Sequence, residues 1–228
     1  MKIIAHRGFS ELYTENTLLS FTKAIECGAD GIETDVRLSL DGHAIIFHDE
    51  SLERLAKINK APRELTLEEL KQLRLPDEQY IPTLSELLEL CENEVSLVLE
   101  IKYHQSTYKR LVRSVNTLIK DKLDWIEVSC FEDIVLEELH ELNKDIKLHK
   151  LIEHASILQE SNFQQKYAYI NCFDINVKLS KVALNLGLIK DKKVIFWTVD
   201  NEDIRDEIEE GLYGVMTDNP QKLQDKYD

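Results

Sequence analysis

Glycine and cysteine are scarce in this chain of 228 residues. With seven glycines and no G-x-G-x-x-G or Walker pattern, a glycine loop that cradles a phosphate is not expected. The four cysteines lie far apart, and no two of them have metal-ligand spacing. A domain of this size needs no disulfides, so we expect free thiols in a reducing compartment.

Long hydrophobic runs and an excess of basic residues are also missing. No stretch approaches the about 18 apolar residues of a membrane span, and no export signal of roughly 7–15 apolar residues precedes His6. The 28 Lys and Arg against 43 Asp and Glu give a net charge of −15, which repels nucleic acids and anionic membranes. We expect a cytoplasmic protein with neither kind of partner, and nothing here indicates an oligomeric state.

Short apolar runs alternate with amphipathic stretches along the chain. The apolar runs are nearly continuous, which is typical of strands buried on both faces of a parallel sheet. We expect strands at 2–5, 31–37, 44–47, 96–102, 125–130, 147–152, 167–173, 194–199 and 214–217. Helices are expected at 17–27, 83–91, 106–120, 132–142, 157–165, 179–186, 201–209 and 220–227.

The alternation favours an α/β fold, a TIM-type (β/α)8 barrel. If 44–47 extends the second strand, eight strands remain at about 28 residues each, close to the minimum for such a barrel. An open doubly wound sheet is the alternative, but its glycine-rich turn is absent. The charged stretch 49–81 is expected to be a short insertion after the second strand, with a helix near 67–73. We expect one domain over 1–228.

Two expected strands carry paired charged side chains on one face. Glu33 and Asp35 are two residues apart, so they point to the same side, where they repel each other unless a metal ion offsets the cost. Glu100 and Lys102 share a face in the same way. An exposed edge strand and a structural salt bridge are the alternative readings. Three carboxylates together suit one hard cation, Mg²⁺ or Ca²⁺, rather than zinc.

Two histidines are expected at the same end of the barrel. His6 and Arg7 follow the first strand, where barrel active sites are built, and His48 ends the extended second strand. A solvated loop for His6, and packing beside Phe47 for His48, are the alternatives. Arg7 and Lys102 supply positive charge for a phosphate-type substrate. The remaining histidines are expected at the surface or in supporting positions: His43, His104, His140, His149 and His154.

Eight short motifs follow one another in order along nearly the whole chain. They are His6-Arg7-Gly8, Glu15-Asn16-Thr17, Glu33-x-Asp35, Asp41-Gly42 leading to His48-Asp49, Pro82-Thr83-Leu84-x-Glu86, Glu100-Ile101-Lys102, Trp197-Thr198-Val199, and Gly-x-x-Gly-x-x-Thr-Asp-x-Pro from Gly211 to Pro220. In this order they resemble the glycerophosphodiester phosphodiesterases.

The resemblance implies a TIM-type barrel that hydrolyses glycerophosphodiesters to glycerol 3-phosphate and an alcohol, using a divalent metal. It places the family's two catalytic histidines on His6 and His48. The metal-binding carboxylates of the family fall on Glu33, Asp35 and Glu100. These are the same residues that the strand-face argument selects.

The resemblance also assigns substrate contacts. Arg7 and Lys102 match the phosphate-side basic residues, and Trp197 matches the aromatic residue that lines the pocket. The chain departs from the family at Thr14, where Pro is usual, and at Asp200, where Asn is usual. The insertion, which covers the pocket in the family, has lost its usual Thr-Thr and Gly positions, so the preferred leaving group stays open.

Imidazole titrates near neutral pH and suits both proton transfers of a phosphodiester hydrolysis. We favour His6 as the base and His48 as the acid, with water or the glycerol 2-hydroxyl as the nucleophile. One alternative is a lysophospholipase D-type enzyme, which needs an exposed apolar rim. The other is a non-catalytic barrel that serves as a binding module, although such relics usually lose the metal carboxylates or histidines that are present here.

Overall fold

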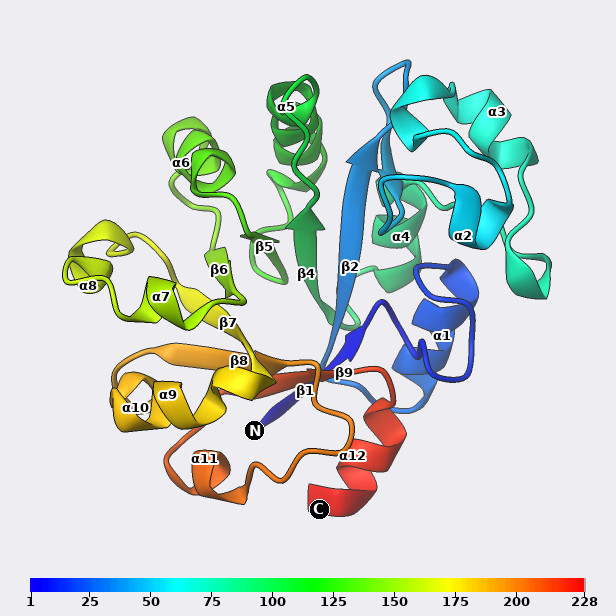
Figure 1. Ribbon diagram of the computed structural model, residues 1–228. Helices are drawn as coiled ribbons and strands as arrows, with labels where there is room; N and C mark the ends of the chain where they lie inside the picture. The colour runs from blue at the N-terminus through cyan, green and yellow to red at the C-terminus, as the bar shows by residue number, and fades with distance from the viewer. Residues whose placement is uncertain (228) are drawn as a thin grey trace.

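Eight parallel strands form a closed ring in the computed structural model, which describes residues 1–227 (Figure 1). The sheet closes because β1 pairs in parallel with both β2 and β9. The expected TIM-type barrel is therefore confirmed. Its strands are β1 (Lys2–His6), β2 (Gly31–Leu38), β4 (Ser96–Ile101), β5 (Ile126–Cys130), β6 (Leu148–Ile152), β7 (Cys172–Asn176), β8 (Lys193–Trp197) and β9 (Gly214–Thr217).

Helices cover the outside of the ring (Figure 1). The longer ones are α1 (Leu18–Glu26), α4 (Leu84–Cys91), α5 (Tyr108–Ile119), α6 (Asp133–Leu142) and α12 (Pro220–Tyr227), and the shorter ones are α7 (Ala155–Leu158), α8 (Phe163–Lys166), α9 (Ser180–Asn185), α10 (Leu188–Asp191) and α11 (Arg205–Glu209). Thr17 and Thr83 cap α1 and α4, each accepting a hydrogen bond from a backbone amide of the first turn. Within residues 1–227, none of the helices combines the length and apolarity needed to cross a bilayer.

The barrel interior has an apolar middle with polar residues towards the ends of the strands. Ile4, Val98, Cys172, Ile195 and Met216 form a small cluster of their own inside the ring. The larger apolar core lies between the strands and the outer helices. Because side chains alternate along a strand, interior positions two residues beyond the small cluster point to the carboxyl-end mouth, where the candidate site lies.

Residues 44–46 correct one expectation. They form β3 (Ala44–Ile46), which pairs antiparallel with β2 rather than extending it. The turn before it uses Gly42 at a φ of +94°, a conformation that favours glycine. The Phe47 amide then donates to the Asp35 carbonyl at 2.9 Å, so the hairpin returns His48 to the middle of β2.

The insertion after β3 folds around a small core of its own. It contains α2 (Glu53–Ala56), the 3₁₀ turns η1 (Pro62–Glu64) and η2 (Pro76–Glu78), and α3 (Leu67–Gln72), where a helix was expected. In Figure 1, α2 and α3 lie together to one side of β2. The buried side chains of this core are Ile45, Phe47, Leu52, Leu65, Leu70, Leu75 and Ile81.

Two expectations in the C-terminal half were wrong. The strand expected at 167–173 begins only at Cys172, because Tyr167 closes α8 and packs edge-on against Phe163 at 5.1 Å. The helix expected at 157–165 is split into α7 and α8. The η3 turn (Val177–Leu179) and α10 were not expected as separate elements.

Candidate active site

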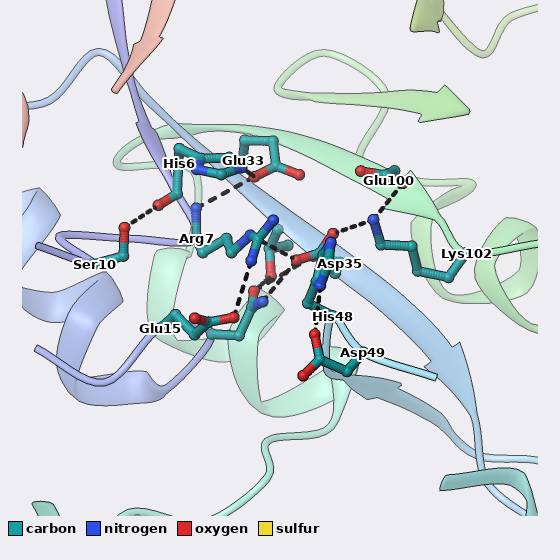
Figure 2. Close-up of polar contacts among 12 residues, drawn as sticks. His6, Arg7, Ser10, Glu15, Glu33, Asp35, His48, Asp49, Glu100 and Lys102 are labelled. Carbon is teal, nitrogen blue, oxygen red and sulfur yellow. Dashed lines mark hydrogen bonds and ion pairs between the residues drawn. The ribbon is translucent and has the colours of Figure 1, made fainter. Parts of the chain in front are cut away.

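Three buried carboxylates lie together at the carboxyl-end mouth of the barrel. Glu33 and Asp35 come from β2 and Glu100 from β4, where Asp35 and Glu100 are direct partners in the strand register. One oxygen from each lies within 4.8 Å of the others, and the residues are only 3, 1 and 8% exposed (Figure 2). The structure thus brings together the trio that the sequence selected, with an all-oxygen donor set that could hold a hard divalent cation.

Two basic side chains partly neutralise this trio. The Lys102 ammonium lies 2.9 Å from Asp35 Oδ1 and 2.5 Å from Glu100 Oε1. The Arg7 guanidinium Nε lies 3.3 Å from Asp35 Oδ2. Both cations therefore lie within ion-pair distance of Asp35. The contacts of Glu33 are instead the Arg7 backbone amide at 3.2 Å and the His6 ring at 3.8 Å.

The uneven charge balance separates the pKa values of the three carboxyl groups. Burial and the nearby Asp35 carboxylate raise the pKa of Glu33 to about 8. Burial also raises the pKa of Glu100. Although burial opposes its ionisation, the pKa of Asp35 is held well below its usual range by Lys102 and Arg7. Further positive charge beside Glu33 would let all three ionise, which is what a bound divalent cation supplies.

The His6 ring is oriented by a carboxylate on its far side. Its Nδ1 lies 2.6 Å from Asp218 Oδ1, and its Nε2 faces Glu33. Burial would lower the pKa of His6, but the hydrogen bond to Asp218 and the charge of Glu33 outweigh burial, so the pKa is raised. Asp218 is itself fixed, since its backbone amide donates to Asp200 Oδ1 at 2.9 Å and Ser10 Oγ donates to its carboxylate at 3.0 Å.

The His48 ring is held in a similar way. Its Nδ1 lies 2.7 Å from Asp49 Oδ1 (Figure 2). Asp49 in turn accepts a hydrogen bond from Arg54 Nε at 2.6 Å. Burial lowers the pKa of His48, and the positive charges of Lys102 and Arg7 add to this effect. Each imidazole therefore presents its Nε2 side away from an orienting carboxylate. Sequence reasoning did not assign these roles to Asp49 and Asp218, although both belong to recognised motifs, Asp49 to His48-Asp49 and Asp218 to the motif from Gly211 to Pro220.

A tight loop after β1 positions the basic side of the site. Arg7 has a φ of +57° and Gly8 a φ of +81°, and a Cβ on Gly8 would lie 2.7 Å from the Ser20 backbone carbon. Ser20 Oγ donates to the Arg7 carbonyl at 3.0 Å. Asn16, also at positive φ, donates from Nδ2 to Asp35 Oδ2 at 2.7 Å. Only glycine fits the position after Arg7, which explains the local His-Arg-Gly order.

The pocket at the barrel mouth has a volume of about 240 Å³ and two unlike walls. One wall is charged and is lined by the predicted residues His6, Arg7, Glu33, His48, Glu100 and Lys102. The other is largely apolar, with Trp197 as expected, and Phe131 meets it edge-on at 5.7 Å. Leu151, Met216 and, at the rim, Glu153 complete this wall. Sequence reasoning missed Phe131, Leu151, Glu153 and Met216, because none of them occupies a specified position of a motif.

One of the histidines expected at the surface or in supporting positions lies deep in the barrel. His149 of β6 is fully buried, with Nδ1 3.0 Å from both oxygens of Asp174 and Nε2 2.5 Å from Glu127 Oε2. It points into the barrel because it lies two residues before the pocket residue Leu151 on the same face. Nothing in the sequence pattern marked this position.

Known proteins resemble the chain over almost its whole length. The model of the glycerophosphoryl diester phosphodiesterase family matches residues 6–222. A glycerophosphodiester phosphodiesterase from Caldanaerobacter subterraneus is 32% identical over 97% of this chain and 95% of that protein. One from Bacillus altitudinis is 31% identical over 97% of this chain and 96% of that protein.

Solved structures of phosphodiesterases are also similar to this chain in fold. A phosphodiesterase from Oleispira antarctica, in complex with the product sn-glycerol-3-phosphate, has a TM-score of 0.88 and 26% identity, covering 99% of this chain and 96% of that chain. A glycerophosphodiester phosphodiesterase from Thermotoga maritima has a TM-score of 0.84 and 29% identity, with coverages of 98% and 97%. The chain therefore belongs to the glycerophosphoryl diester phosphodiesterase family and is a phosphoric diester hydrolase.

Proposed function

We propose that the chain hydrolyses glycerophosphodiesters, such as glycerophosphocholine and glycerophosphoethanolamine, to glycerol 3-phosphate and an alcohol. The observation that carries the proposal is one pocket in which a buried carboxylate trio lies beside two imidazoles, each oriented by its own carboxylate. The product named for the similar Oleispira protein, sn-glycerol-3-phosphate, is consistent with this substrate class.

Glu33, Asp35 and Glu100 would hold one divalent cation, Mg²⁺ or Ca²⁺. Their oxygens already lie within reach of one another, and the pKa of Glu33, raised to about 8 by burial and Asp35, marks where positive charge is lacking. Such a cation supplies charge that stabilises the negative phosphoryl oxygens. Asn16 and Lys102 would keep the Asp35 carboxylate in place through their contacts at 2.7 and 2.9 Å.

Arg7 and Lys102 would bind the phosphodiester from the charged wall of the pocket. Both side chains are largely buried and held by ion pairs, so they need little reordering when a phosphate binds. The two imidazoles would then move protons, one from the nucleophile and one to the leaving alkoxide. The nucleophile is either water, which gives glycerol 3-phosphate directly, or the glycerol 2-hydroxyl, which would give a cyclic phosphate that water then opens.

The apolar wall would contact the carbon part of the substrate. Phe131, Leu151 and Trp197 offer rings and methyl groups opposite the charged wall. A lysophospholipid would need such a surface to continue outward as a rim for its acyl chain. Glu153, an exposed carboxylate, stands at this edge of the pocket and favours a polar alcohol instead.

Turnover of glycerophosphocholine and lysophosphatidylcholine, each with and without EDTA, tests the proposal. We expect release of glycerol 3-phosphate from glycerophosphocholine, loss of this activity in EDTA, and recovery on adding Mg²⁺ or Ca²⁺. Faster turnover of the lysophospholipid would assign the lysophospholipase D-type activity. No turnover of either substrate with either metal would leave a binding module.

A further inference from the structure

A second group of metal-ligating side chains lies inside the barrel, on strands that the proposed catalytic trio does not use. One ring nitrogen of His149, Cys172 Sγ and an Asp174 carboxylate oxygen all lie within 4.8 Å of one another, and all three residues are buried. His149 and Cys172 are direct partners in the register of β6 and β7, and Asp174 follows two residues later on the same face. The set mixes imidazole, thiol and carboxylate, which is a zinc-type donor set.

The distances are close to those of a metal site. His149 Nδ1 faces the Asp174 carboxylate symmetrically, 3.0 Å from each oxygen. With Zn–N and Zn–O bonds of about 2.0–2.2 Å at a tetrahedral angle, these atoms would be about 3.4 Å apart. Shifts of a few tenths of an ångström would therefore admit the ion.

A carboxylate also supports the other side of the histidine ring. Glu127 Oε2 lies 2.5 Å from His149 Nε2, and Lys147 holds the second Glu127 oxygen at 3.4 Å. Histidine ligands of metals typically donate their other ring N–H to such a carboxylate, which fixes the tautomer. With Nε2 carrying the proton, the Nδ1 lone pair faces the Asp174 carboxylate.

A polar atom without a partner lies beside the cluster. Ser129 of β5 is the register partner of His149 and is 1% exposed. Within residues 1–227, its hydroxyl oxygen has no hydrogen-bond partner. A hydroxyl there can hold a water molecule as the fourth ligand of a tetrahedral ion.

We propose that His149, Cys172 and Asp174 bind a second, thiophilic divalent cation such as Zn²⁺, with Glu127 as the outer support of the histidine. Binding would release the thiol proton and one imidazolium proton, so the ion's two positive charges replace two protons and the net charge of the buried cluster stays the same. Thiolate and imidazole ligands select zinc over Mg²⁺ and Ca²⁺, whereas the oxygen trio prefers the latter.

Cobalt absorption distinguishes the two sites. The complete chain is unfolded, refolded with Co²⁺ and excess Mg²⁺, and compared with Zn²⁺-refolded protein by elemental analysis. We expect a near-ultraviolet thiolate-to-cobalt charge-transfer band, which the oxygen trio cannot produce, and zinc that survives dialysis against Mg²⁺. Cys172→Ser should abolish the band. Cys130→Ser is the matched control, because Cys130 is also only 1% exposed and its thiol donates a hydrogen bond to the Ile101 backbone carbonyl instead.

The wild-type measurement decides the matter even if a variant does not fold. A refolded wild-type chain with neither a thiolate band nor retained zinc would overturn the proposal. His149, Cys172 and Asp174 would then be a hydrogen-bonded cluster without a metal ion. A band that persists in Cys172→Ser would also overturn it. Asp174→Asn, which keeps the side-chain shape, is the second variant and should weaken zinc retention while glycerophosphodiester turnover with Mg²⁺ continues.

Discussion

Single residues in the candidate active site are held in place by partners that have no part in the proposed proton transfers. Asp218 orients His6, and Asp200 in turn accepts hydrogen bonds from the Thr217 hydroxyl and the Asp218 amide, both at 2.9 Å. The departure from the family at Asp200 is therefore compatible with the site, because this side chain serves here as a hydrogen-bond acceptor. Asp49 provides the same support for His48.

Glu33→Gln tests the metal assignment. The variant should lose hydrolysis and bind Mg²⁺ or Ca²⁺ much more weakly, because an amide oxygen lacks the charge that offsets the cation. Its fold should hold in EDTA, since the pKa of Glu33 is raised to about 8 by burial and Asp35 and the group is already neutral without metal at pH 7. Calorimetry and thermal unfolding measure both effects. Glu153→Gln, outside the trio, is the control, and unchanged metal affinity in Glu33→Gln would remove Glu33 as a ligand.

The histidine roles are tested by changing the leaving group. His6→Ala and His48→Ala should each lower kcat by roughly 10²–10⁴-fold with glycerophosphocholine, while metal affinity stays near that of the wild type. If His48 is the acid, a 4-nitrophenyl ester of glycerol phosphate should restore most of the rate in His48→Ala, because nitrophenolate leaves without a proton. It should not rescue His6→Ala. Rescue of His6→Ala alone would reverse the two roles.

Among the elements, those with a strong local signal were predictable and those that depend on distant packing were not. The Thr-capped helices and the strand at Gly214–Thr217 were anticipated closely, because caps and continuous apolar runs are local. β3 was misread, since an antiparallel return and a strand extension share the same apolar pattern. The predicted site residues lie together because parallel strands all end at the same mouth of the barrel. Phe131 and His149 could not be predicted, because no local sequence pattern marks them.

Asp133 joins three elements and is expected to make stability depend on pH. At the start of α6, its carboxylate lies 2.7 Å from the Lys150 ammonium of β6 and 3.0 Å from that of Lys166 in α8. Burial opposes ionisation of Asp133, but the two lysines outweigh burial and lower its pKa. With the folded pKa below the unfolded one, this stabilisation is complete above the unfolded pKa and is lost as pH falls through the folded pKa.

Asp133→Asn should therefore destabilise the protein at pH 7 by about 2 kcal/mol, because it leaves the buried Lys150 without its carboxylate partner while solvent screens part of the loss. The difference from the wild type should be smaller at pH 3, because protonation of the wild-type carboxyl group increases as the pH falls towards its lowered folded pKa. Urea unfolding at both pH values measures this change. Asp203→Asn, at an exposed ion pair with Arg205, should have little effect at pH 7. An equal deficit at both pH values would contradict the charge argument.

The net charge of the whole molecule repels an anionic substrate at long range. The net charge of −15 repels anions, whereas the walls of the pocket concentrate Arg7 and Lys102 at short range. The alcohol half of the substrate is expected to contribute little to recognition, because the proposed role of both positive groups is to bind the phosphate. The long-range field therefore distinguishes substrates by their net charge rather than by their shape.

Glycerophosphoglycerol, a monoanion, and glycerophosphocholine, a zwitterion, should respond differently to salt at a fixed metal concentration. The screening length falls from about 30 Å at 0.01 M to about 8 Å near 0.15 M, which removes most of the repulsion felt by the monoanion. We expect kcat/KM for glycerophosphoglycerol to rise about threefold or more over this range, and that for glycerophosphocholine to change little. At the higher salt these two and glycerophosphoethanolamine should lie within about one decade, or roughly 1.4 kcal/mol. Identical salt responses would show that the long-range field does not affect the rate of substrate association. A hundredfold preference for one alcohol would show that the pocket recognises the leaving group.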